Sequence, residues 1–309
     1  MPPTSRTTRR SRRPATRPAQ RRRLIVATTG EPESRGALRF AASLCERFQT
    51  ASVLALGVSV PFPHNVSTML SLGQPASVDE ESRRELLDAV RRAVADIPGA
   101  DRWEKVAITG TPSEEINAIA ERWGATMLIL GLGHHNRLDR IFGSETAIAV
   151  MRHARIPFVA VPATSRGLPE RALVGMDFTD ASMAAAHLAA QLVPQHGVLY
   201  VAHVCAFAGA PAEPGDLIDL YRAGARAKLD DVVAKIRHQA DCAIESFLLE
   251  GEPADAILSL AKREACALIA LGGHEHGLVD RILLGSIRTK VLRGAACSVL
   301  IAPPTPRDG

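Results

Sequence analysis

Short runs of consecutive apolar residues alternate with amphipathic helical patterns along most of the chain. In the first half, the apolar runs predict strands at residues 24–29, 51–59, 105–109, 126–130 and 158–161. The patterns between them predict a loop over residues 60–77 and helices at residues 34–48, 78–97, 113–123 (capped by Ser113) and 144–153. Because the apolar runs are continuous, we expect parallel strands that are covered on both faces.

The second half repeats this order of elements. Its apolar runs predict strands at residues 172–176, 198–204, 242–249, 267–271 and 298–301. Its helical patterns lie at residues 180–192, 215–239, 253–262 and 286–292. Strands that alternate with helices and return through right-handed crossovers form a doubly wound α/β sheet. We therefore expect two such domains, joined by a short linker and followed by a short tail. The expected ranges are 24–162 and 171–303 for the domains, 163–170 for the linker and 304–309 for the tail.

The two halves are also similar residue by residue. Leu138-Asp-Arg-Ile-Phe-Gly-Ser144 corresponds to Val279-Asp-Arg-Ile-Leu-Leu-Gly-Ser286, and Gly110 precedes its counterpart Gly251 by 141 positions. A period of this length is too long for a solenoid repeat and is typical of a duplicated domain. A residue that is kept in one copy and lost in the other therefore marks a place where the halves can differ in function.

The basic charge of the chain is concentrated in its first 23 residues. They contain nine arginines and no acidic residue, whereas the whole chain of 309 residues has a net charge of +4. Subtracting these nine charges leaves −5 for residues 24–309. Because residues 1–23 have almost no large apolar side chain, we expect a disordered tail. Three interpretations of the tail stay open: a solvated leader, a weak salt-sensitive contact with nucleic acid or an acidic surface, and a transit peptide.

The remaining composition narrows the class of protein. The five cysteines show no C-x-x-C spacing and lie mostly within apolar runs, which favours reduced core thiols in a cytoplasmic protein. No run of 18 apolar residues predicts a membrane span. The sequence has neither a Walker A motif nor a Gly-x-Ser-x-Gly motif, so we expect no P-loop or serine-nucleophile chemistry. His134-His135 and His274-x-His276 lack further ligands within sequence reach for a tetrahedral metal site.

Each half carries two glycine-containing turns that suit a phosphate group. Glycine lets backbone N–H groups approach an anion closely, and a helix start adds free N–H groups and the positive end of the helix dipole. Either turn alone is also explained by ordinary packing or helix capping, whereas the pair in each half favours a ligand site. The turns after the fourth strands are Gly131-Leu-Gly-His134 and Gly272-Gly-His-Glu275, and those at the predicted helix starts are Gly143-Ser144 and Gly285-Ser286.

With these motifs, the chain from Leu24 to Pro303 resembles two universal stress protein domains in tandem. The second half matches best, through Val174-Gly-Met-Asp177, His203-Val204 and the glycine turns. The resemblance implies Rossmann-like domains with five-stranded parallel sheets of order 3-2-1-4-5, and a site for ATP or another adenine nucleotide, with or without Mg²⁺. It places Asp177 at the adenine. The residues that would bind the nucleotide are Asp177, Val204, Gly272, Gly285, Ser286 and Ile287.

The two copies depart from the family pattern to different degrees. In the second half, Glu275 stands where a glycine is expected, and its carboxylate would face the phosphates. In the first half, Thr29 replaces the acidic residue of the first strand and His134 replaces the second glycine. We therefore expect nucleotide binding in the second half and a degenerate site in the first.

The resemblance leads to a primary hypothesis and two alternatives. The primary hypothesis is a stress-adaptation protein that binds a small ligand and signals by conformational change, without enzymatic turnover. The alternatives are a nucleotide-independent interaction scaffold and a slow ATPase, although no general base for the latter is evident. The resemblance also predicts an intrachain pseudo-dimer in which Phe158–Val161 and Ser298–Ile301 lie near the contact, and it allows a homodimer of whole chains.

Overall fold

The ten strands of the protein form one continuous sheet. The structure is a computed structural model that describes residues 22–49, 52–61, 75–132, 140–206, 215–273 and 287–304. The strand order is β3-β2-β1-β4-β5-β10-β9-β6-β7-β8. Each half therefore contributes five neighbouring strands in the order 3-2-1-4-5, and pairing within each half is parallel. The predicted doubly wound fold is confirmed, with the two sheets merged into one.

The strands coincide closely with the apolar runs of the sequence. Those of the first half are β1 (Arg23–Ala27), β2 (Ser52–Ser59), β3 (Glu104–Thr109), β4 (Met127–Leu132) and β5 (Phe158–Pro162). Those of the second half are β6 (Arg171–Gly175), β7 (Val198–Cys205), β8 (Ala243–Glu250), β9 (Leu268–Gly272) and β10 (Ser298–Ala302). The central strands are buried along most of their length, as parallel strands covered on both faces require.

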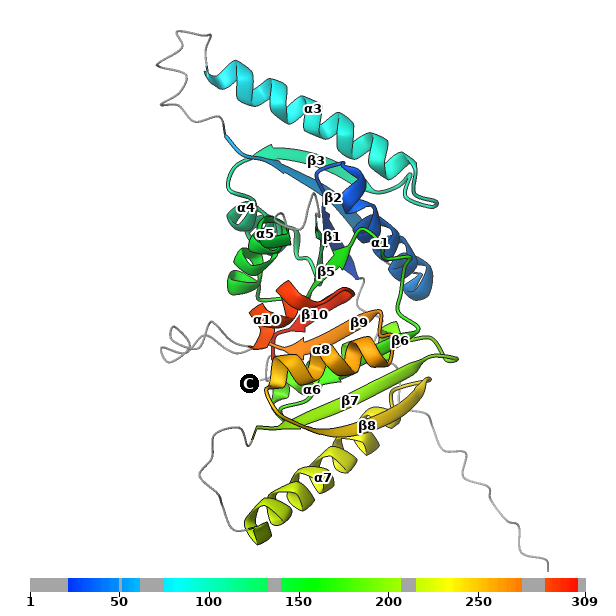
Figure 1. Ribbon diagram of the computed structural model, residues 1–309. Coiled ribbons are helices and arrows are strands. Elements are labelled where there is room, and N and C mark those ends of the chain that lie inside the picture. The colour runs from blue at the N-terminus through cyan, green and yellow to red at the C-terminus, as the bar shows by residue number, and fades with distance from the viewer. Residues whose placement is uncertain are drawn as a thin grey trace, which may run out of the picture.

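Helices cover both faces of the sheet. The first half contains the 3-10 helix η1 (Pro32–Ser34) and the α-helices α1 (Arg35–Phe48), α3 (Pro75–Ala95), α4 (Pro112–Trp123) and α5 (Arg140–His153). The second half contains α6 (Asp180–Leu192), α7 (Gly215–Arg237), α8 (Pro253–Arg263) and α10 (Ile287–Gly294). Helices α1, α3, α6 and α7 contribute to one apolar core, and α4, α5, α8 and α10 to the other. Figure 1 shows α3 and α7 at opposite ends of the molecule.

The two halves meet where β5 and β10 lie side by side. These strands pair antiparallel, with Val159 opposite Leu300 and Ala160 opposite Val299. All four side chains are fully buried. The predicted contact between the fifth strands is therefore confirmed, and each strand protects the edge that the other would leave open.

Three predicted helix starts are wrong, and all three helices begin earlier. Ser113 does not cap α4, because Thr111 occupies the N-cap and Pro112 begins the helix; proline is favoured there since its fixed φ matches the first helical position. Helix α5 begins at Arg140, so Gly143 and Ser144 lie inside the helix and not at its start. Proline also begins α3, at Pro75, inside the predicted loop.

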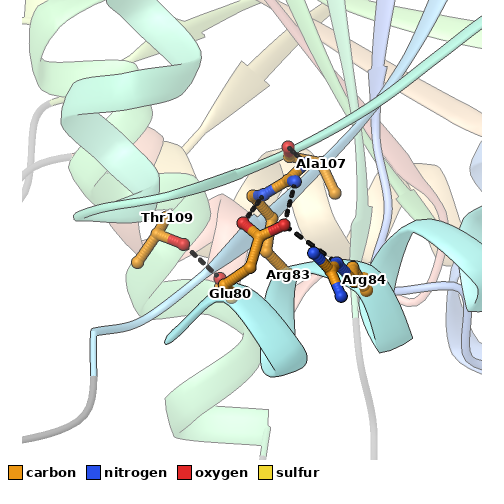
Figure 2. A network of polar contacts seen from close by, with 6 residues as sticks. Glu80, Arg83, Arg84, Ala107 and Thr109 are labelled. Atoms are coloured by element: carbon orange, nitrogen blue, oxygen red, sulfur yellow. Dashed lines mark hydrogen bonds and ion pairs between the residues drawn. The ribbon is translucent and has the colours of Figure 1, made fainter. Parts of the chain in front are cut away.

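A charged network attaches α3 to the edge strand β3. Glu80 accepts hydrogen bonds from Arg83 (2.8 and 2.9 Å) and from Arg84 (2.9 Å), as Figure 2 shows. Arg83 also donates to the carbonyl oxygen of Ala107 in β3, at 3.5 Å. The hydrogen bond from Arg83, followed by that from Arg84, lowers the pKa of Glu80 to about 2. The Glu80 carboxylate therefore stays ionised across the physiological range.

The cysteines of the chain are free thiols. Cys205, Cys242 and Cys266 are buried, while Cys45 and Cys297 are half-buried. Burial raises the pKa of the Cys266 thiol to about 12 and that of Cys297 to about 11. Because the thiolate is the reactive form, these thiols are poor nucleophiles at neutral pH.

Neither a membrane-spanning helix nor a metal-binding cluster occurs among the described residues. Those residues include no helix that is both long enough and apolar enough to cross a membrane. They also include no group of three His, Cys, Asp or Glu side chains that could hold a metal ion. The histidines at positions 134, 135, 274 and 276 lie outside the described residues.

Candidate functional site

The candidate site of the second half lies at the carboxyl ends of β6, β7 and β9. Strand β6 pairs with β7 on one side and with β9 on the other, so chain connections from these strands leave in opposite directions. Such a switch point is where open α/β sheets bind ligands. Asp177 lies two residues beyond β6, Val204 near the end of β7 and Gly272 at the end of β9. The structure thus brings three of the predicted residues to one edge of the sheet.

Of the other predicted residues, Ile287 lies within the described part of the chain. Ile287 is the first residue of α10 and is partly buried. Gly285, Ser286 and the unusual Glu275 lie outside the described residues. The expected phosphate side of the site therefore stays a prediction.

Asp177 organises the turn that leads into α6. Its Oδ1 atom accepts hydrogen bonds from the Thr179 N–H (3.1 Å) and the Thr179 hydroxyl (2.6 Å). This Asx-type turn supports Phe178, whose φ of 65° lies in the left-handed region. Thr179 in turn caps α6 by accepting from the Ser182 N–H at 3.2 Å. Asp177 itself is exposed, and its carboxylate stands in a hydrogen-bonded turn at the switch point.

His203 connects the ends of β6 and β7. Its Nδ1–H donates to the carbonyl oxygen of Met176 at 2.7 Å, and its ring lies 4.4 Å from the ring of Phe178. In the neutral ring this leaves a lone pair on Nε2, which is buried and has no hydrogen-bond partner among the described residues. Sequence reasoning noticed His203 only as part of the His203-Val204 motif and missed its hydrogen bond to Met176, which joins residues that are distant along the chain.

Gly272 is required by packing. A Cβ atom at this position would lie 2.6 Å from the backbone nitrogen of Ser182 and 2.8 Å from the carbonyl carbon of Ala181. The first turn of α6 therefore sits directly on the end of β9. In the first half, a Cβ atom at Gly131 would lie 3.0 Å from the Cα atom of Ser34. The glycine after the fourth strand consequently does not by itself indicate a phosphate.

The first half has a different set of side chains at the equivalent edge. Thr29 lies two residues beyond β1, as Asp177 does beyond β6. Glu33 lies four positions after Thr29, and its counterpart Ala181 lies four positions after Asp177. Thr29 and Glu33 line a cavity of about 280 Å³ at the ends of β1, β2 and β4. The role of Glu33 was missed, and the signal was the exchange of alanine for glutamate between the copies.

A doubly wound domain that occurs twice in one chain, each copy with its own switch point, defines a tandem Rossmann-like protein. The chain belongs to the universal stress protein family, because the model of the "Universal stress protein family" matches residues 20–162 and again 169–303. The two matches confirm that two such domains occur in this one chain.

The chain is similar to two proteins of the same tandem length and to one of about half that length. A universal stress protein of Mycolicibacterium smegmatis is 24% identical over 288 residues, which cover 91% of this chain and 97% of that protein. The crystal structure of a universal stress protein from Archaeoglobus fulgidus superposes with a TM-score of 0.66 at 19% identity, covering 93% of this chain and 100% of that one. A universal stress protein crystallised in complex with cAMP is 25% identical, with a TM-score of 0.34, and covers 45% of this chain and 99% of its own.

Proposed function

We propose that the second half binds an adenine nucleotide and that the protein acts in stress adaptation through this binding rather than through turnover. The observation that carries the proposal is Asp177, an exposed carboxylate in a hydrogen-bonded turn at the switch point. A carboxylate that accepts hydrogen bonds suits the exocyclic amino group of adenine. Val204 supplies apolar surface at the end of the neighbouring strand.

The signal would leave the site through α6. The turn that holds Asp177 also caps this helix through Thr179, and α6 contacts β10, the strand at the seam between the halves. A ligand that tightens this turn would therefore bias the position of β10, the strand at which the two halves meet. Only a ligand with different affinities for two arrangements can shift the balance between them.

The two halves are proposed to be unequal. Thr29 replaces the acidic residue in the first half, so that half lacks a carboxylate at the position that would contact adenine. Its Gly143 and Ser144 lie within α5 and not at a helix start, which removes the free N–H groups expected there. We expect one nucleotide per chain.

Isothermal titration of the full chain with ATP and with AMP, each with and without magnesium, tests the proposal. A protein concentration of about 0.1 mM suits micromolar affinities. Asp177→Asn is the informative variant, because its side-chain oxygen can still support the turn while the negative charge is lost. Thr29→Ala alters the matching position of the first half and serves as the control. We expect weaker binding for Asp177→Asn and unchanged binding for Thr29→Ala.

Equal affinity of the wild type and Asp177→Asn would show that the adenine assignment is wrong. A second variant, Glu275→Gly, tests the phosphate side. If the carboxylate there repels phosphate, this variant is expected to bind ATP more tightly while its affinity for adenosine stays the same.

The alternative is an interaction scaffold that binds no nucleotide. One observation favours it: Asp177 has a structural role in the turn, and Gly272 is explained by its contact with α6. Both residues would then be kept for the fold alone. Absence of heat with every nucleotide would support the scaffold, and magnesium-dependent phosphate release would indicate a slow ATPase instead.

A further inference from the structure

A second cavity lies at the amino ends of β6, β9 and β10, which run parallel to one another. Arg171 begins β6, Ala267 directly precedes β9 and Ser298 begins β10, and all three residues line the cavity. The linker, residues 163–170, supplies much of the remaining wall. The volume is about 560 Å³, which falls within the range of small-molecule sites. This cavity is at the opposite ends of the strands from the proposed nucleotide site.

The linker wall of this cavity is held in place by α1. Arg39 of α1 donates to the carbonyl oxygen of Ala163 at 2.8 Å and to that of Ser165 at 3.0 Å. A Cβ atom at Gly167, whose φ is 141°, would lie 2.6 Å from Ser43 Oγ, so the linker passes close against the same helix. The wall is therefore formed before any ligand arrives, which lowers the entropic cost of binding.

Ser298 places a hydroxyl group without a partner at this cavity. The residue is only 2% exposed, and its backbone N–H donates to the carbonyl oxygen of Ala267 at 3.1 Å. Its hydroxyl group forms no hydrogen bond with another residue that the structure describes. Buried polar groups are normally hydrogen-bonded, so this hydroxyl lacks a partner that a ligand can supply. A hydroxyl can donate or accept, and the charge of the cavity decides which ligand suits it.

Two arginines give the cavity an excess of positive charge. Arg166 is exposed and forms no hydrogen bond or ion pair within the described part of the chain. Arg171 uses Nη1 to donate to the carbonyl oxygen of Glu264 at 3.1 Å, and its other N–H groups stay available. The acidic residue in the lining is Glu170. Its side chain is 76% exposed and lies 3.8 Å from His196 Nε2, so solvent screens its charge.

The end of α8 does not cancel this positive charge. Free carbonyl groups give a helix C-terminus a partial negative charge. Here four of these carbonyl groups accept hydrogen bonds, those of Leu260, Ala261, Lys262 and Glu264. The thiols of Cys266 and Cys297 also line the cavity, and their raised pKa values keep them uncharged at neutral pH. The lining therefore favours an anion.

We propose that this cavity binds a small organic dianion, with its negative oxygens at Arg166, Arg171 and the Ser298 hydroxyl. Guanidinium groups bind carboxylate and phosphate in the same bidentate manner, so the shared chemistry is two negative charges carried on oxygen. Pro162 and Leu168 supply apolar surface for the body of the ligand. The site does not depend on nucleotide binding by the second half, because none of the predicted nucleotide-binding residues lines it.

Saturation-transfer NMR of the full chain with three aromatic probes tests the proposal. Isophthalate and isophthalamide share their shape and differ in charge, while phenyl phosphate carries its two charges on one group. We expect isophthalate or phenyl phosphate to bind with a Kd on the order of 1 mM, as suits a fragment. The tighter of the two identifies the anionic group. Transfer to isophthalamide as strong as to isophthalate, or none to either dianion, would overturn the proposal.

Matched arginine variants locate the site. Arg166→Gln and Arg171→Gln are each expected to weaken binding of the dianion about five-fold or more, because each removes a charge-assisted hydrogen bond. Arg102→Gln removes the same charge from an exposed position that does not line the cavity, and should change the Kd less than about two-fold. Equal weakening by all three variants would show that the attraction is non-specific and would overturn the proposal.

Two conservative variants separate ligand contact from a change of fold. Ser298→Ala keeps the backbone pairing of β10 and should weaken binding about three-fold or more, because one hydrogen bond to the anion is lost. Arg166→Lys keeps the charge but not the planar fork, so its affinity should lie between those of the wild type and Arg166→Gln. Unchanged affinity of the Ser298→Ala protein would overturn the placement of the anion in this cavity.

Discussion

Alanine at Gly272 is expected to destabilise the folded chain even when no ligand is present. The added Cβ atom would approach the backbone of α6 to 2.6 Å at Ser182 and 2.8 Å at Ala181, and real Cβ atoms do not tolerate contacts below 3.0 Å. The helix start must therefore move. Overpacking of this kind costs about 1–3 kcal/mol. Because Thr179 and Asp177 belong to the same turn, we also expect weaker nucleotide binding.

Alanine at two other glycines is expected to change the stability by different amounts. At Gly131 the added Cβ atom would approach Ser34 to 3.0 Å, so Gly131→Ala should cost less than Gly272→Ala. At Gly224, in the exposed part of α7, the added atom meets nothing within 4 Å. Gly224→Ala should therefore stabilise the chain by about 0.5–1 kcal/mol, because alanine favours the helix.

Urea denaturation without nucleotide measures the free energy of unfolding of the three variants. From most to least stable, we expect the order Gly224→Ala, Gly131→Ala, Gly272→Ala. A Gly272→Ala protein within about 0.5 kcal/mol of the wild type, which is the usual range for a neutral surface change, would refute the packing argument. The glycine would then need another explanation, and contact with a ligand would be the leading one.

Three further predictions concern the seam, the helix cap and the charged network. Leu300→Ala removes a fully buried side chain between β5 and β10 and should lower the free energy of unfolding by about 2–5 kcal/mol; a change below about 1 kcal/mol in urea would contradict the role of the seam. Thr179→Ala removes the oxygen that caps α6 and should cost about 1 kcal/mol by the same assay, whereas Thr179→Ser should retain the cap. Because hydrogen bonds from Arg83 and Arg84 lower the pKa of Glu80 from its ordinary value of 4.5 to about 2 in the folded protein, its contribution is present above pH 4.5 and is lost as the pH falls toward 2. The difference in Tm between the wild type and Glu80→Gln should shrink across that window, and a constant difference would show that Glu80 does not stabilise through its charge.

Local sequence patterns were sufficient to predict the strands and the fold of each half. Continuous apolar runs such as Leu268–Leu271 are short, bounded by polar turns and rich in branched side chains, which is the pattern of strands buried on both faces. The repeat then showed that one domain occurs twice. Helix starts were less accurate: α4 begins at Pro112, one residue before Ser113, and α5 begins at Arg140, before the predicted start at Gly143-Ser144.

Part of the candidate site could also be predicted. Comparison of the two copies shows that Thr29 stands where the second half has Asp177. Each residue follows the first strand of its own half, which places each at the switch point of that half. The second function of Asp177 was not predicted, because an Asx turn depends on the backbone angles of Phe178 and not on residue type alone.

The sequence by itself determined the fold of each half, the family and the inequality of the two copies, because these depend on patterns that are local or repeated. The tertiary structure decided how the halves join, what Gly272 contacts and what lines the cavity beside Glu33. Each of these depends on side chains that are distant along the chain: Val159 meets Leu300, and the end of β9 meets the start of α6. Such contacts arise only when the strands take their places in one sheet, so no local pattern records them.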